Sequence, residues 1–173
     1  LFVTNYADQS NTLYLQSQAG FFEDATRQMN LREPSFAMLG FGTQFLDADL
    51  DGWLDLVLTN GHVYDFTYAG RPYAMRPQLM HNTRRGKFRE VFAEQGGEFF
   101  AEQRVGRGLA RLDWNGDGRE DFAVSHIGQP AALVVNRTER PGHFVSIRLV
   151  GVVSERDAIG AVATLSLSDG AQI

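Results

Sequence analysis

An internal repeat constrains the fold of this chain more than any other feature. The segment "DADLDGWLDLVLTN" begins at Asp47, and "DWNGDGREDFAVSH" begins 66 residues later, at Asp113. Each follows a Gly-x-apolar stretch and leads into an apolar run. A third copy opens the chain, where "LFVTN" at 1–5 matches "LVLTN" at 56–60, and we expect this copy to be truncated before its aspartate loop. Self-similarity at this spacing predicts one supersecondary unit that is built repeatedly.

Each copy is predicted to supply about four short antiparallel strands. Short apolar runs alternate with clusters of Gly, Asn, Asp and Pro, which is typical of an all-β fold. The expected strands are a run after the aspartate loop (55–59, 121–125), an "LYL"-type run (13–16, 78–81, 132–135), a Phe-led run (21–25, 88–92, 143–149) and a run entering the next aspartate loop (41–46, 107–112). No helical periodicity is convincing. Four strands in each unit favour the blades of a β-propeller.

The two aspartate loops share one spacing of oxygen ligands. Loop 1 covers residues 47–55 and loop 2 covers 113–121, and in both, acidic or amide side chains stand at positions 1, 3, 5 and 9 with glycine at position 6. Hard oxygen ligands at alternate positions can face one cation, and glycine allows the sharp turn. We therefore expect about two Ca²⁺ ions, one per loop, with the backbone carbonyl of position 7 as a further ligand. The expected ligands are Asp47, Asp49, Asp51, Trp53 and Asp55 in loop 1, and Asp113, Asn115, Asp117, Arg119 and Asp121 in loop 2.

Other interpretations of the loops differ in what they require. An EF-hand needs glutamate at position 12 and a following helix, but that position holds Leu58 or Val124 inside a β-rich run. Mg²⁺ prefers few protein ligands and several waters. A turn rich in Asx hydrogen bonds, without any metal, stays open as an alternative. The indole of Trp53 is expected to pack on its own blade.

The middle copy carries an insertion rich in aromatic residues. Between Asn60 and Leu79 the chain advances 19 positions, against 8 and 7 in the other copies. The segment 62–77 contains Tyr64, Phe66, Tyr68, Arg71 and Tyr73. Aromatic side chains with arginine are favoured at binding interfaces, so this loop is a candidate surface for a protein or carbohydrate ligand. The alternative, that it packs on its own blade, is equally open.

These motifs resemble the FG-GAP/VCBS repeat of integrin α-subunit propellers and related bacterial extracellular proteins. Calcium loops of the form D-x-D/N-x-D-G-x-x-D occur in that family. The tail 145–170 resembles the opening of the ASPIC/UnbV domain, through Ser154 and the run "RDAIGA" at 156–161, with Glu155 in place of the usual asparagine. The combination is similar to the cartilage acidic protein family. The resemblance implies a partial β-propeller over 1–142 and the initial strands of a truncated, β-rich C-terminal domain over 143–173.

The resemblance also implies a calcium-binding scaffold for adhesion that is secreted, periplasmic or on the cell surface, without catalysis. A propeller-type enzyme acting on polysaccharide is the alternative. The net charge of −5 and the lack of a long basic stretch argue against nucleic acid as a partner. No apolar run approaches the roughly 20 residues of a membrane span. Open blade edges would favour self-association.

Overall fold

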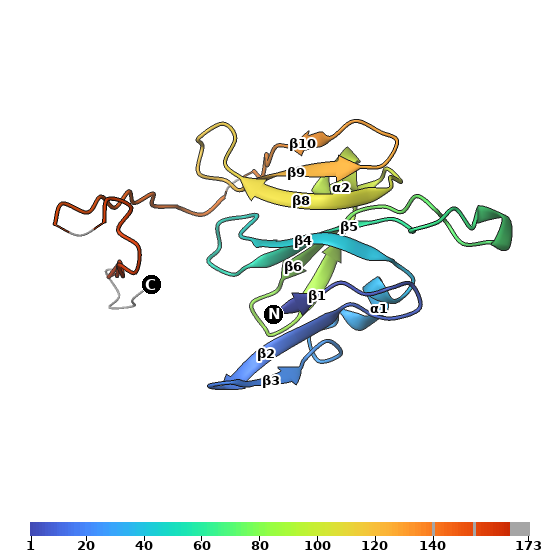
Figure 1. The fold of residues 1–173 in the computed structure, drawn as a ribbon, viewed down its shortest axis with the longest axis horizontal. Helices are drawn as coiled ribbons and strands as arrows, with labels where there is room; N and C mark the ends of the chain where they lie inside the picture. The colour runs from blue at the N-terminus through green and yellow to red at the C-terminus, as the bar shows by residue number, and fades with distance from the viewer. Residues whose placement is uncertain (140, 154, 167–173) are drawn as a thin grey trace.

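The computed structural model describes residues 1–139, 141–153 and 155–166, and these residues form a mostly β structure of three antiparallel sheets. Sheet 1 contains β1 (Phe2–Val3), β2 (Thr12–Gln18) and β3 (Phe21–Asp24). Sheet 2 contains β4 (Gly40–Leu46), β5 (Asp55–Asn60), β6 (Gln78–Asn82) and β7 (Phe88–Val91). Sheet 3 contains β8 (Gly106–Leu112), β9 (Asp121–His126) and β10 (Ala132–Val134). The sheets lie beside one another in chain order (Figure 1).

Nearly all the strands predicted from the repeat are present, which confirms the β-rich class. The exception is 143–149, which was predicted as a strand and forms none. Its apolar pattern is suitable for a strand, but no described strand pairs with it, and a strand needs a neighbour for its backbone hydrogen bonds. The other described residues from 150 to 165 also form no strand, so the expected start of a second β-rich domain is not seen there. Residue 154 and residues 167–173 of that expected domain lie outside the described residues.

Each aspartate loop connects two neighbouring strands of the same sheet. β4 pairs with β5 across loop 1, with Leu46 opposite Asp55, and β8 pairs with β9 across loop 2, with Leu112 opposite Asp121. The strand that enters a loop therefore belongs to the same sheet as the strand that leaves it. Each loop is the tip of a β-hairpin.

Sheet 2 is central, and its strand β5 is buried on both faces. Leu56 and Leu58 join a core that includes Leu13 of sheet 1, whereas Val57 joins a core that includes Phe122 of sheet 3. Successive side chains of a strand point to opposite faces. The continuous apolar run after loop 1 thus follows from packing between two neighbouring sheets.

Neighbouring sheets are joined by one contact that occurs twice. Thr4 of the first copy donates its hydroxyl to the carbonyl of Phe41 at 3.1 Å, and the equivalent Thr59 donates to that of Arg107 at 3.2 Å. The glycine that precedes each acceptor makes room, since a Cβ on Gly106 would lie 2.7 Å from Thr59. The step from sheet 1 to sheet 2 is therefore repeated from sheet 2 to sheet 3. Within the described chain, the three sheets do not close into a ring.

The helical elements are short. They are α1 (Arg32–Phe36), η1 (Thr67–Ala69), α2 (Ala93–Gly96) and η2 (Glu98–Phe100). α2 and η2 occupy the connection from β7 to β8. None of the helices in the described residues has the length and apolarity needed to cross a membrane.

Candidate metal centre

Both loops begin with a carboxylate that accepts the backbone amides of its own turn. Asp47 accepts the amides of positions 5 and 6 at 3.0 and 2.8 Å, and Asp113 accepts the same two amides at 3.1 and 3.0 Å. The backbone at position 6 is left-handed in both loops, with φ of 86° at Gly52 and 81° at Gly118. Glycine adopts that conformation without strain, so the predicted sharp turn is confirmed.

The position 5 carboxylates are each held by a backbone amide and an arginine. Asp51 accepts the amide of Trp53 at 2.7 Å, and Asp117 accepts that of Arg119 at 3.0 Å. The arginine differs between the loops. Nε of Arg84, from the turn between β6 and β7, lies 2.5 Å from Asp51, whereas Arg119 of loop 2 itself pairs with Asp117. These arginines already offset part of the acidic charge of each loop.

The position 9 aspartates are buried and tie each loop to its sheet. Asp55 is 1% exposed and Asp121 is 0% exposed. One oxygen of each accepts the position 2 amide of its loop, at 3.2 and 2.9 Å. The other oxygen accepts the amide of Asn82 or Asn136, at 2.7 Å in both cases. The same two hydrogen bonds in both loops show that this aspartate has a structural role.

Position 3 distinguishes the loops. Oδ1 of Asp49 is buried and has no hydrogen-bond partner among the described residues. In loop 2 the equivalent Asn115 is exposed and donates to Asp117 at 2.8 Å. A buried carboxylate oxygen without a partner is costly, and a cation would remove that cost.

Two overlapping groups of side chains at loop 1 could hold a metal ion. One group is Asp47, Asp49 and Asp51, and the other is Asp49, Asp55 and His81. In each group the ligand atoms lie within 4.8 Å of one another. Among the described residues, such groups of three acidic or histidine ligands occur only at loop 1. Loop 2 has asparagine at position 3.

The charges in the loops have unequal surroundings. Burial raises the pKa of Asp55 to about 6, against the opposing effects of the Asn82 amide and of His81. In loop 2 the hydrogen bond from the side chain of Arg119 lowers the pKa of Asp117 to about 2. The anionic form is thus disfavoured at the buried Asp55 of loop 1 and favoured at the half-buried Asp117 of loop 2.

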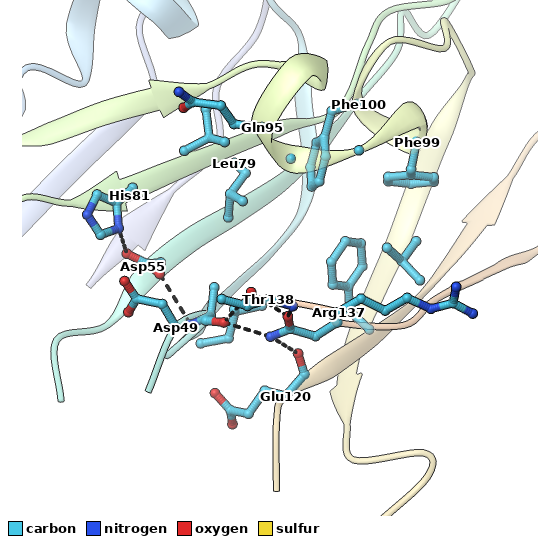
Figure 2. Close-up of a pocket in the computed structure, with 18 of the residues that line it drawn as sticks. Asp49, Asp55, Leu79, His81, Gln95, Phe99, Phe100, Glu120, Arg137 and Thr138 are labelled. Carbon is cyan, nitrogen blue, oxygen red and sulfur yellow. Dashed lines mark hydrogen bonds and ion pairs between the residues drawn. The ribbon is translucent and has the colours of Figure 1, made fainter. Parts of the chain in front are cut away.

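A cavity of about 860 Å³ lies between sheets 2 and 3, next to loop 1 (Figure 2). Leu79, Phe99 and Phe100 supply part of its apolar lining. Asp55 and His81 lie together at one side of the cavity. Loop 1 therefore borders a half-open pocket as well as free solvent.

The predicted ligand-binding residues lie at the opposite end of sheet 2, since the insertion follows β5 and loop 1 precedes it. The insertion projects beyond the sheets (Figure 1). Tyr64 and Tyr68 are 65% and 85% exposed. Phe66 stacks edge-on against the buried His62, with ring centroids 5.2 Å apart. Arg71 forms an ion pair with Asp8 at 3.0 Å, and Tyr73 is half-buried.

Some site residues agree with the sequence-based expectations and others do not. Trp53 is 49% exposed, so the expectation that its indole packs into the blade is wrong. The motif spacing does not place Arg84 or His81 at the site, whereas the strand pairing does place His81 there. Leu56 faces Met80, so the next pair along is Asp55 with His81. Asn82 was detectable because the repeat places Asn136 at the equivalent position.

Comparison of the chain with family models and with curated proteins gives no match.

Proposed function

We propose that this chain is part of a calcium-stabilised β-propeller that acts as a non-catalytic binding scaffold outside the cytoplasm. The observation that carries the calcium assignment is the shared geometry of the two loops. In both, the position 1 and position 9 carboxylates accept equivalent backbone amides. Each loop is thereby held in one shape, with the side chains of positions 1, 3 and 5 on the same turn.

The ligand chemistry favours calcium in these turns. Side chains at positions 1, 3 and 5 are all oxygen donors, and Ca²⁺ takes six to eight oxygen ligands in flexible geometry. The unpartnered Oδ1 of Asp49 fits a cation there. Position 9 is expected to help hold the ion through the lone pairs that its backbone hydrogen bonds leave free. We propose one ion per loop, and a tighter one in loop 1, which has four carboxylates.

The propeller assignment is supported by the repeated step between sheets. The Thr4 and Thr59 contacts place each sheet on the next in the same manner, as expected for successive blades. Further blades, supplied by additional sequence or by a second chain, would cover the outer faces of sheets 1 and 3. The family resemblance to FG-GAP/VCBS repeats and the extracellular location belong to this proposal.

The insertion is the proposed binding surface. Tyr64 and Tyr68 present exposed aromatic rings. Phe66 lies between them and links the three rings into one cluster, with centroids 5.9 Å from Tyr64 and 6.0 Å from Tyr68. Aromatic groups of this kind favour sugar rings and protein surfaces. The opposite location of the calcium loops lets the ions stiffen the sheet without occupying the binding face.

The alternative, an enzyme acting on polysaccharide, has one observation in its favour. Asp55, with its raised pKa, and His81 line a cavity, and such groups are typical of functional sites. Against a catalytic role, both oxygens of Asp55 accept backbone amides. We therefore favour a binding role for the segment.

Calorimetry tests the calcium assignment directly. Chelator-treated protein titrated with CaCl₂ is expected to bind two ions, and Asp47→Ala and Asp113→Ala are each expected to remove one. Thr67→Ala, in the insertion, is the control and should leave both sites intact. Absence of binding heat, together with a melting temperature indifferent to calcium, would refute the assignment. For the binding surface, Tyr64→Ser with Tyr68→Ser should weaken retention on immobilised polysaccharides or partner proteins without changing calcium binding.

A further inference from the structure

Three side chains that commonly bind metals meet where loop 1 borders the cavity. Nδ1 of His81 lies 3.1 Å from Oδ1 of Asp55. With Asp49, the three ligand atoms fall within 4.8 Å of one another. Figure 2 shows Asp49 and His81 on either side of Asp55. The three residues come from the loop, from the start of β5 and from β6, so the fold itself assembles them.

The position 3 carboxylate, which also supports the calcium assignment, is a second indication of a bound cation at this turn. Oδ1 of Asp49 is buried and accepts no hydrogen bond from the described residues. Its neighbour Asp55 is held by the backbone amides of Ala48 and Asn82. Such hydrogen bonds orient a carboxylate as outer-shell partners orient the ligands of metal sites. One carboxylate is thus fixed in direction, and the other has an oxygen that lacks a partner.

The histidine gives this group a chemistry that the second loop does not share. The repeat places Val135 where His81 stands, and the equivalent of Asp49 is Asn115. Imidazole nitrogen suits Zn²⁺ and neighbouring transition metals, whereas Ca²⁺ prefers oxygen. Zn²⁺ bonds of about 2.0–2.2 Å at tetrahedral angles place adjacent ligand atoms roughly 3.3–3.6 Å apart. The 3.1 Å between His81 and Asp55 is slightly shorter, so the two ligand atoms would move slightly apart on binding the ion.

We propose that Asp49, Asp55 and His81 form a transition-metal site of the Zn²⁺ class on the cavity side of loop 1. Three protein ligands leave a fourth coordination position open, as at zinc sites that bind water or an exogenous ligand. The cavity of about 860 Å³ provides the space beside it.

This site shares Asp49 and Asp55 with the calcium loop of the proposed function, and to that extent it rests on the same turn. A carboxylate has two oxygens, so Asp49 can face an ion on each side. The two metals are distinguished by their ligands, because His81 is absent from the group formed by Asp47, Asp49 and Asp51. Loss of His81 should therefore affect zinc and leave calcium unchanged.

The test uses the full chain, stripped of metals and then saturated with CaCl₂, and titrates it with ZnCl₂ by calorimetry. One equivalent of Zn²⁺ is expected to bind. His81→Ala and His81→Gln should each weaken this binding at least tenfold while the calcium stoichiometry stays the same. His126→Ala is the matched control, because this histidine also lies on a strand, at the end of β9, but is not part of the group formed by Asp49, Asp55 and His81. This variant should leave zinc binding unchanged. Co²⁺ in place of Zn²⁺ should give visible absorption bands that disappear in His81→Ala.

A variant that gains a zinc site complements the His81 variants, in which loss of zinc binding could also result from local unfolding. Val135→His combined with Asn115→Asp places the same three ligand types beside Asp121 and should add a second equivalent of Zn²⁺. Zinc binding that is absent, or that is unaffected by both His81 variants, would overturn the proposal and leave the His81–Asp55 contact a plain hydrogen bond. If calcium fails to bind while zinc still depends on His81, the proposed function fails and this inference stands.

Discussion

The two aspartate loops have the same turn but different neighbours. Loop 1 is covered by segments that adjoin sheet 3. The carbonyl of Ala48 accepts hydrogen bonds from Asn136 at 2.7 Å and Thr138 at 3.0 Å, just after β10, and the Asp47 amide donates to Glu120 of loop 2 at 2.8 Å. No described sheet lies beyond sheet 3 to cover loop 2 in the same way. Consequently the position 1 and position 3 side chains are half-buried in loop 1 and exposed in loop 2.

The difference in cover explains how each loop balances its charge. Loop 2 is largely self-contained, because Arg119 and Asn115 both bond to Asp117 within nine residues of sequence. Loop 1 relies on a distant partner, Arg84, and still leaves Asp49 Oδ1 without one. A covered acidic turn gains more from a cation than an exposed one, because water screens the repulsion less well there.

The largest expected effect is the loss of a position 9 aspartate. Asp121→Ala removes the acceptor of two backbone amides, those of Trp114 and Asn136, and should lower the free energy of unfolding by about 3–4 kcal/mol. Asp55→Ala should cost less, about 2–3 kcal/mol, because burial already disfavours the charge of Asp55. Urea unfolding of chelated protein measures both values. Asp113→Ala, in the exposed part of loop 2, is the control and should cost less than either. Equal losses for all three variants would show that the buried hydrogen bonds are not the cause.

Calcium should stabilise the protein, and loop 1 should contribute more than loop 2. At a hundredfold excess over its Kd, an ion that binds only the folded state adds about 2.7 kcal/mol. Asp49→Asn makes position 3 of loop 1 like that of loop 2 and should weaken calcium binding at loop 1 by about tenfold, or about 1.4 kcal/mol. Asn115→Asp should strengthen binding at loop 2. Calorimetry on both variants checks this, and unchanged affinities would show that position 3 is not a ligand.

Stability should depend on pH with opposite signs in the absence and presence of calcium. The pKa of Asp55 is about 6 in the folded state, above the ordinary value of 3.8, so the folded protein binds more protons between these values. In metal-free buffer this group makes stability fall, by about 2 kcal/mol, as pH rises from about 4 to about 6. With calcium the carboxylates must be deprotonated, so the calcium-dependent gain should grow over the same range.

Thermal melting in metal-free buffers at pH 4.5 and 6.5 measures this window, and Asp55→Asn is the control that should flatten it. The lowered pKa of Asp117 affects stability only below this pH range, because the stability that the ionised Asp117 contributes is lost as pH falls through about 2. A metal-free stability that rises between pH 4 and 6 would show that other carboxylates dominate.

The sequence predicts what is local and repeated. The hairpin strands, the glycine turn and the position of the insertion all follow from patterns within a few residues. The hairpin and its turn occur twice, which fixes how the two copies align. The contacts of Arg84 with Asp51 and of His81 with Asp55 join residues that are 33 and 26 positions apart in the sequence. They depend on which strands pair, so the spacing of a local motif does not predict them. Residues 143–149 show the reverse case, because a strand-like pattern without a neighbouring strand forms no sheet.

The smallest expected effect concerns position 4 of the loops, which is left-handed in both, with φ of 56° at Leu50 and 72° at Gly116. A Cβ on Gly116 would meet no atom within 4 Å, so Gly116→Ala tests backbone conformation alone and should cost about 1 kcal/mol. Leu50→Gly relieves the same strain in loop 1 but frees the unfolded chain and removes a half-buried side chain, so we expect a change within about 0.5 kcal/mol of zero. Urea midpoints measure both, and Gly116→Asn, which tolerates this conformation better, should cost less than Gly116→Ala. If Gly116→Ala were neutral, the uncovered loop would be free to adopt another turn in the absence of metal, and the matched geometry of the two hairpins would depend on the ion.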